Sequence, residues 1–341
     1  MSMRSIPCYD LDVKKQVTGT GEILVDLSGT GRERPWSKRK MENRRLVEIL
    51  EAARQLDGFV ISERRLDAVR DCASWLLFAL FAEHESGGRK LAKANFCRLR
   101  LCPMCAWRRS LKLFSQVSAI TDAILADKKA RFLFVSLTVR NCSGDALRDT
   151  IARMGEGFSR IVTKGNGGTG TEAFRKSLLG YMKAIEVTYN RKTGTFHPHI
   201  HAIFEVRPSY FGAGYLTHDD WRMMWQEVMH LDYEPQVDVR AIKTATARAV
   251  AEVAKYPVKM RSLLGITDTE HAARVLIQLK RALHGCRLIT FGGDFREYKR
   301  RLGLDDVETG SLVHVEADSR TLNAIAYTLF RYRADAGAYI C

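Results

Sequence analysis

The sequence has no apolar run long enough to cross a membrane. Its longest run, residues 74–82, is far shorter than the roughly 20 residues that a spanning helix needs, and it favours a buried helix instead. Residues 1–10 also lack the apolar core of a secretory signal. We therefore expect no membrane partner and a cytoplasmic location. Such a reducing compartment disfavours a disulfide framework for the eight cysteines, so clustered cysteines indicate a metal site.

Acidic residues are scarce relative to basic ones. The 341 residues include 39 Asp and Glu against 54 Lys and Arg, which gives a net charge of +15. Apolar residues make up 46% of the chain and charged residues 27%, a balance that excludes disorder of the whole chain and predicts a globular protein. The excess of positive charge favours a polyanionic partner.

The pattern of the chain predicts four parts. Residues 1–31 form a flexible arm, and residues 32–127 form a helical, DNA-binding region that holds the cysteine cluster. Residues 128–305 form a second domain, which contains the histidine and tyrosine motifs described below, and residues 306–341 form a C-terminal segment of unassigned role.

Hydrophobic periodicity places helices and strands along these parts. The expected helices are a basic stretch that continues to residue 56, then 63–82, 107–126, 145–162, 217–229 and 241–256, and the expected strands are 132–139, 181–189, 199–206 and 236–240. The two middle strands should form a hairpin through residues 190–194. A Gly-rich stretch at 165–170 lacks the Lys and Ser or Thr of a phosphate-binding loop, so we interpret it as a surface connection. The order predicts an α+β fold, with a central antiparallel sheet and flanking helices after a helical, zinc-knuckle-containing region.

Three histidines alternate along the second strand of the expected hairpin. His197, His199 and His201 share one face because strand side chains alternate, but the outer two lie about 13 Å apart, too far for one ion. Pro198 should disturb regular pairing, so His199 and His201 are the better pair. Glu186, the only acid in the preceding strand, is expected beside them as a third ligand. Two imidazoles and one carboxylate leave coordination positions open, as in a catalytic site for Mn²⁺ or Mg²⁺.

A later helix is expected to carry a tyrosine with charged neighbours. Glu252 and Tyr256 are four residues apart and share one helical face. Tyrosine is a poor nucleophile at its ordinary pKa of about 10, so it needs a cation, a polarised substrate or a base to activate it. Lys255 and Lys259 could stabilise the phenolate or hold DNA phosphates.

The cysteine cluster has the spacing of a zinc knuckle. Cys97, Cys102 and Cys105 follow a Cys-x₄-Cys-x₂-Cys pattern, which supplies three ligands of a structural Zn²⁺ site. We expect Cys72 as the fourth ligand, with His84 as the alternative.

Arginines surround this knuckle. A zinc module of this kind is expected to contact the phosphate backbone of DNA or to help select the origin sequence. The arginines in question are Arg98, Arg100, Arg108 and Arg109.

Taken together and in this order, the motifs resemble a known family. The uninterrupted strand 132–141, the histidine strand after a Glu strand, and the Glu-x-x-x-Tyr-x-x-Lys helix resemble the rolling-circle plasmid replication initiator (Rep) family, single-tyrosine members of the HUH endonuclease superfamily. The resemblance extends from about Cys72 to Leu304 and includes residues 287–293, where Phe291 departs from the Tyr often found.

The resemblance implies a nicking and joining enzyme, with residues 128–305 as its catalytic domain. His199 and His201 would bind the divalent ion that polarises the scissile phosphate of the plasmid origin, and Tyr256 would attack that phosphate. The products would be a 5′-phosphotyrosyl protein and a free 3′-OH that a polymerase extends. Glu252 would serve as base for a second attack, which ends the cycle.

Two other interpretations stay open at this point. One is an HUH transposase or relaxase with the same chemistry, and the other is a non-catalytic, zinc-dependent DNA-binding regulator. Besides double- and single-stranded origin DNA, we expect a host helicase and a host polymerase as partners, and we leave a homodimer open.

Overall fold

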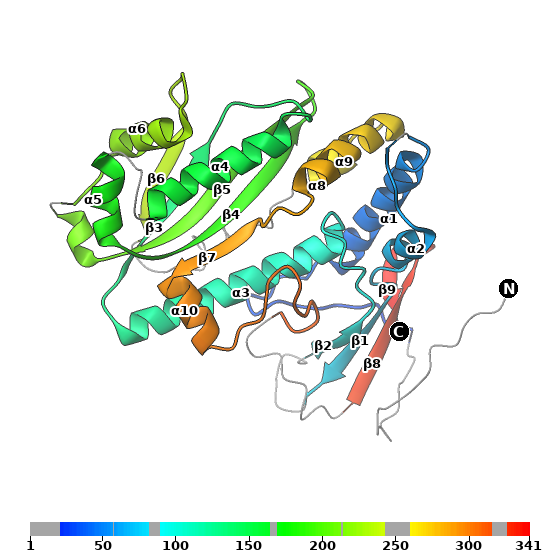
Figure 1. Cartoon of the computed structure of the whole chain (residues 1–341). Coiled ribbons are helices and arrows are strands. Elements are labelled where there is room, and N and C mark those ends of the chain that lie inside the picture. Colours follow the sequence, from blue (N-terminus) through cyan, green and yellow to red (C-terminus); the bar gives the residue numbers. More distant parts are fainter. Residues whose placement is uncertain are drawn as a thin grey trace.

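The computed structural model describes residues 21–56, 58–81, 89–163, 169–212, 214–242, 260–315 and 326–341. Within these ranges, a five-stranded and a four-stranded sheet are flanked by helices (Figure 1). All pairs of neighbouring strands are antiparallel. The predicted α+β class, with a central antiparallel sheet and flanking helices, is confirmed.

The five-stranded sheet has apolar side chains on both faces. Its order is β6 (Val237–Ile242), β3 (Arg131–Thr138), β5 (Thr195–Val206), β4 (Leu178–Asn190) and β7 (Ile289–Gly293). One face packs on α3 (Pro103–Asp127) and α10 (Asp294–Arg301). The other face packs on α4 (Leu147–Val162), α6 (His218–Met229), α8 (Met260–Leu264) and α9 (Thr269–Leu283), with α5 (Thr169–Ser177) and the 3₁₀ helix η1 (Pro208–Phe211) beside them. Burial on both faces explains why the interior strand β3 is a nearly continuous apolar run.

The β4–β5 hairpin is confirmed. Its turn is stabilised by the Asn190 Oδ1 atom, which accepts hydrogen bonds from the backbone N–H groups of Lys192 and Thr193. Gly194 closes the turn with a φ of +68°, a conformation that other residues rarely adopt. The register that results pairs Glu186 with His199.

The four-stranded sheet combines strands from residues 75–94 with strands from the C-terminal segment. Its order is β2 (Arg89–Ala94), β1 (Trp75–Leu80), β8 (Ala326–Arg333) and β9 (Ala338–Ile340), and α1 (Trp36–Ala53) packs beside it. The C-terminal segment, which had no role assigned from the sequence, therefore supplies two of the four strands.

The prediction of one helix over 63–82 is wrong. The helix α2 ends at Arg70, and residues 75–80 form the strand β1. The reason is non-local, because Leu76 pairs with Ala94 on one side and with Phe330 on the other.

The remaining predicted elements agree with the structure except for one boundary. The helices at 107–126, 145–162 and 217–229 and the strands at 132–139 and 236–240 are confirmed as α3, α4, α6, β3 and β6, with small shifts at their ends. The helix predicted for 241–256 does not begin at Ala241, because residues 241 and 242 continue β6, and the rest of it lies outside the described residues.

Several other predicted features also lie outside the described residues. They are residues 1–20 of the arm, the Gly-Gly break within 82–88 and residues 165–168 of the Gly-rich stretch. The division of the chain into four parts stays a prediction. None of the helices in the described ranges combines the length and the apolar character that a membrane span requires.

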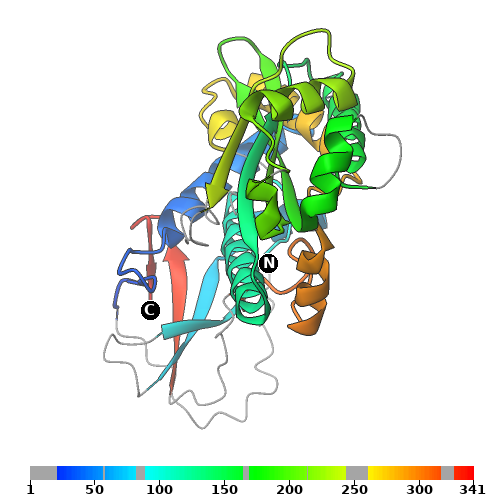
Figure 2. The same ribbon diagram turned by 90° about the vertical axis from the view of Figure 1, so that its left-hand side faces the viewer.

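The long helix α3 lies between the two sheets (Figure 2). Its first turn contributes Met104 and Cys105 to the same apolar cluster as Phe78 and Phe330 of the smaller sheet. Its later turns pack on the larger sheet through residues such as Val117. The helix therefore connects the cysteine cluster to the sheet that carries the histidines.

Candidate active site

Two strands bring the predicted metal ligands together. Glu186 of β4 stands directly opposite His199 of β5, and His201 follows on the same face of β5. Glu186 is completely buried, and His199 is only 8% exposed. The three side chains form a group of potential metal ligands whose donor atoms all lie within 4.8 Å of one another.

The donor atoms converge on one point. The Glu186 Oε2 atom is 3.5 Å from the Nε2 atom of His199 and 3.4 Å from the Nε2 atom of His201. Two donors that share an ion at about 2.1 Å from each can be at most about 4.2 Å apart, so these distances fit a shared ion. Nitrogen and carboxylate ligands from three residues would leave coordination positions for substrate oxygens.

A hydrogen-bond partner at the Nδ1 atom orients each of the two imidazoles. The His199 Nδ1–H donates to the backbone carbonyl of His197 at 3.2 Å, and the Nδ1 atom of His201 lies 2.7 Å from the Ser136 hydroxyl. The Phe134 ring also stacks on His201 at a centroid distance of 5.7 Å. Fixing Nδ1 in this way leaves the Nε2 lone pair facing Glu186, which is how metal-binding histidines are commonly held.

His197 is outside this group of ligands. Its Nδ1 atom lies 2.9 Å from the Oδ1 atom of Asn141, at the end of β3. Pro198 pairs with Val187 in unbroken register, so the expected disturbance of pairing is wrong. The reason is that the pairing of β3 with β5 stops at His199, so on that side β3 does not extend to Pro198.

The four cysteines Cys72, Cys97, Cys102 and Cys105 form a second group of potential metal ligands. The Sγ atom of Cys72 is 3.6 Å from those of Cys102 and Cys105, and the sulfurs of Cys97 and Cys105 are 3.7 Å apart. A tetrahedral zinc ion with Zn–S bonds of about 2.3 Å requires sulfur–sulfur distances of about 3.8 Å, so the cluster fits Zn²⁺. His84, the alternative ligand, lies outside the described residues.

Hydrogen bonds link the four sulfurs to one another and to nearby N–H groups. Backbone N–H groups of Cys97 and Arg98 point at the sulfurs of Cys72 and Cys105, and the Asn43 amide donates to Cys102. Hydrogen bonds with Cys102 and Cys105 raise the pKa of Cys72 well above its ordinary value, because the Cys72 thiol keeps its proton and shares it with the neighbouring buried sulfurs. A bound cation would replace those protons.

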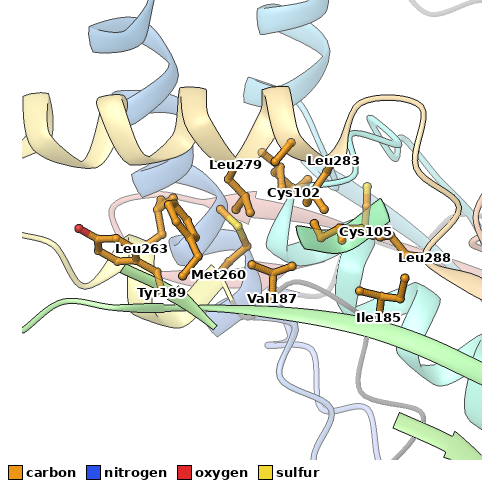
Figure 3. Packing of buried hydrophobic residues seen from close by; sticks show 14 of the residues in the cluster. Cys102, Cys105, Ile185, Val187, Tyr189, Met260, Leu263, Leu279, Leu283 and Leu288 are labelled. Carbon is orange, nitrogen blue, oxygen red and sulfur yellow. The ribbon is translucent and has the colours of Figure 1, made fainter. Parts of the chain in front are cut away.

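The cysteine cluster packs against the elements next to the histidine site (Figure 3). Cys102 and Cys105 belong to the same buried cluster as Leu279 and Leu283 of α9. Val187, which follows Glu186 in β4, belongs to this cluster too. The cysteines are therefore part of the core beneath the strand that carries a metal ligand.

The arginines around the knuckle bind backbone carbonyls. Arg108 donates to the carbonyls of Leu312 and Val313, and Arg109 donates to that of Glu308. Only 4% of Arg108 and 3% of Arg109 is exposed, so we leave both out of the DNA surface proposed below. Arg100 donates to the Leu283 carbonyl and pairs with Glu308, and Arg98 donates to the carbonyls of Thr309 and Gly310.

The predicted nucleophile and its neighbours cannot be placed. Glu252, Lys255, Tyr256 and Lys259 all lie outside the described residues, between β6 and α8. Their roles rest on the sequence alone.

Two residues of the site were missed in the sequence. Ser136 and Asn141 hold the Nδ1 atoms of His201 and His197. The sequence does contain one sign of the role of Ser136, because Ser136 is a polar residue inside the apolar strand β3.

The chain is similar to known replication proteins. The model of a family described as "Replication protein" matches residues 88–340. A "Protein rep" of Streptococcus pneumoniae serotype 2 (strain D39 / NCTC 7466) is 36% identical over 305 residues, covering 87% of this chain and 89% of the relative. A "Protein rep" of Bacillus amyloliquefaciens is 33% identical over 328 residues, covering 91% and 94%. No solved structure matches the chain.

These matches define a DNA replication protein. The chain belongs to the Rep replication protein family, and the resemblance to rolling-circle plasmid replication initiators stated from its motifs is confirmed.

Proposed function

We propose that the protein starts rolling-circle replication by nicking one strand of plasmid origin DNA and later rejoins the ends. The observation that carries the proposal is the convergence of Glu186, His199 and His201 at donor distances of 3.4 and 3.5 Å. Their side chains would hold Mn²⁺ or Mg²⁺. When bound, such an ion supplies Lewis acidity that polarises the scissile phosphate.

The path of the chain supports Tyr256 as the nucleophile. Tyr256 precedes Met260 by four residues, so its Cα atom is within about 14 Å of the Met260 Cα atom. Met260 begins α8 and packs with Val187 of β4 (Figure 3). The pairing of β7 with β4 ends at Ala184, so β7 does not cover the edge of β4 beside Glu186. This short connection to Met260 would allow Tyr256 to reach a scissile phosphate at the edge of β4 beside Glu186.

The proposed reaction exchanges one phosphodiester for another. The Tyr256 oxygen forms a bond to phosphorus, and the bond from phosphorus to the 3′-oxygen breaks. The phenol proton leaves to a base or to solvent, and the 3′-oxygen takes up a proton to become the free 3′-OH. Because the phosphotyrosyl ester keeps the bond energy, a later hydroxyl can rejoin the strand. Glu252 would take the proton of that second attacker.

Lys255 and Lys259 would stabilise the phenolate or hold phosphates, and a host polymerase and helicase would use the nicked product. We further propose Zn²⁺ as the ion for Cys72, Cys97, Cys102 and Cys105. Its support is the tetrahedral spacing of the four buried sulfurs. Its role would be structural, because four cysteines complete the coordination of the ion.

The test is a nicking assay with three proteins. Wild type, Tyr256→Phe and Tyr215→Phe are incubated with supercoiled origin plasmid or a labelled single-stranded origin oligonucleotide, in Mn²⁺ or in EDTA. Tyr215 is 57% exposed and lies outside the proposed site, so its variant is the matched control. We expect nicked DNA with covalently attached protein from wild type and Tyr215→Phe, only with metal. Cleavage by Tyr256→Phe, or in EDTA, would contradict the mechanism.

A further inference from the structure

The strands β4 and β5 approach α8 at their hairpin end (Figure 1). A cleft opens there. Its volume is about 780 Å³. The lining consists of residues from the end of β3, from the hairpin and from α8. They are Asn141, Thr188, Tyr189, Asn190, Arg191, Lys192, His197, Arg261 and Ser262.

The charged residues that line this cleft in the described part of the chain are basic. They are Arg191, Lys192 and Arg261, and no aspartate or glutamate is among the described residues that line the cleft. Lys192 and Arg261 are both exposed, and neither pairs with an acid in the part of the chain that the structure describes. Arg191 is held in place, because it donates to the Gly265 carbonyl at 2.7 Å. Among the described residues, the cleft thus offers two cations without an acidic partner and a third that is positioned by the backbone.

The cleft adjoins the metal-ligand group at His197. His197 lines the cleft, and its ring lies 5.2 Å from that of His199, measured between centroids. Asn141, another lining residue, is within hydrogen-bond distance of His197. A phosphate chain in the cleft would therefore pass directly to the site where the metal ligands converge.

We propose that this cleft binds the phosphates of single-stranded DNA next to the scissile bond, with Lys192 and Arg261 as the main contacts. The inference rests on the proposed nicking function and deepens it. A single strand is favoured over a duplex because duplex DNA is recognised by elements that enter its grooves, whereas single strands follow basic grooves on the protein. The residues named here are positioning residues and take no part in the bond exchange.

The test compares two double variants of equal charge. Lys192→Gln with Arg261→Gln removes two cations from the cleft. The control, Lys129→Gln with Arg296→Gln, removes one lysine and one arginine that are exposed at the opposite end of the sheet, near the starts of β3 and β4. Binding of single-stranded and duplex origin oligonucleotides is measured in EDTA over a range of salt concentrations, and nicking of the single strand is measured separately in Mn²⁺.

We expect the cleft variant to bind the single strand about tenfold more weakly, with a salt slope smaller by about 1.4, because each lost phosphate contact removes about 0.7 from that slope. The control variant and duplex binding should change much less. The cleft proposal would be overturned if single-strand binding weakened equally in both double variants, or if it did not weaken in the cleft variant. Nicking by the wild type would leave the proposed function intact in either case. If wild type does not nick but the cleft variant loses single-strand binding, the cleft proposal stands and the nicking function fails.

Discussion

Glu186 stands directly across the β4–β5 ladder from His199, with 3.5 Å between its Oε2 atom and the imidazole Nε2 atom. A carboxylate that is completely buried is costly unless a cation or hydrogen bonds compensate it. The second imidazole, His201, approaches the same oxygen at 3.4 Å. This arrangement is therefore expected to depend on a shared cation, and its variants should reveal that dependence.

Glu186→Gln should weaken metal binding with little change of shape. The amide keeps the size of the side chain but loses the negative charge, so we expect Mn²⁺ affinity to fall by more than about 100-fold, beyond the roughly 10- to 100-fold loss typical of outer-shell changes. The measurement is a Mn²⁺ titration by calorimetry, together with the metal concentration that gives half-maximal nicking. Glu172→Gln on α5, which is exposed, is the control and should behave as wild type. Unchanged Mn²⁺ affinity in Glu186→Gln would exclude it as a ligand.

Ser136→Ala tests the support of His201. Removing the hydroxyl 2.7 Å from Nδ1 frees the imidazole to rotate, so we expect Mn²⁺ affinity to fall by about 10- to 100-fold. The metal requirement for nicking should shift, while the maximal rate at saturating Mn²⁺ is largely recovered. Ser159→Ala removes a hydroxyl that donates to the Gly155 carbonyl within α4 and serves as the control. A loss of rate that excess Mn²⁺ does not restore would contradict an orienting role.

Cys105→Ala should release the proposed zinc ion. A three-cysteine remnant cannot complete a tetrahedral site, so we expect bound zinc to fall from one ion per chain to near zero and the free energy of unfolding to drop by several kcal/mol. Zinc content by mass spectrometry and urea unfolding measure these two effects. Cys286→Ala is the matched control, because Cys286 lies outside the cluster and its thiol donates to the Ala282 carbonyl. Equal zinc content in both variants would refute the assignment.

The histidine site was predictable because its determinants are local. Alternation along one strand places His199 and His201 on the same face, and a short hairpin turn fixes which residue of the neighbouring strand stands beside them. The contribution of Ser136 was not predictable in this way. It comes from β3, and the pairing of β3 with β5 spans a long connection that includes α4 and α5.

The strand β1 shows where local pattern fails. Residues 75–80 are a short apolar run, and such a run fits a buried helix as well as a buried strand. The choice is made by partners far away in the chain, since β8 supplies Phe330 opposite Leu76. The same limit applies to Arg108, because its binding of the Leu312 carbonyl depends on a distant segment.

A last prediction concerns Lys183, a buried lysine of β4. Its side chain packs over the Phe158 ring at 4.7 Å, and the residue is only 8% exposed. Burial lowers the pKa of Lys183 to about 8 from 10.5. Below pH 8 the amine is charged in the folded and unfolded chain alike, so folding carries the full cost of burying the charge. Between pH 8 and 10.5 the unfolded chain binds more protons, so stability rises with pH.

Lys183→Met removes this cost, because methionine fills similar space without a charge. A shift of about 2.5 pKa units corresponds to about 3 kcal/mol, so the variant should be more stable than wild type by up to that amount at pH 7. The difference should shrink as pH approaches 10.5, where wild-type Lys183 is neutral in both states. Urea unfolding at pH 7 and pH 10 measures it, with Lys93→Met on the exposed side of β2 as the control. A difference that is the same at both pH values would mean that the Lys183 amine stays hydrated in the folded protein, and its burial would then have no energetic consequence.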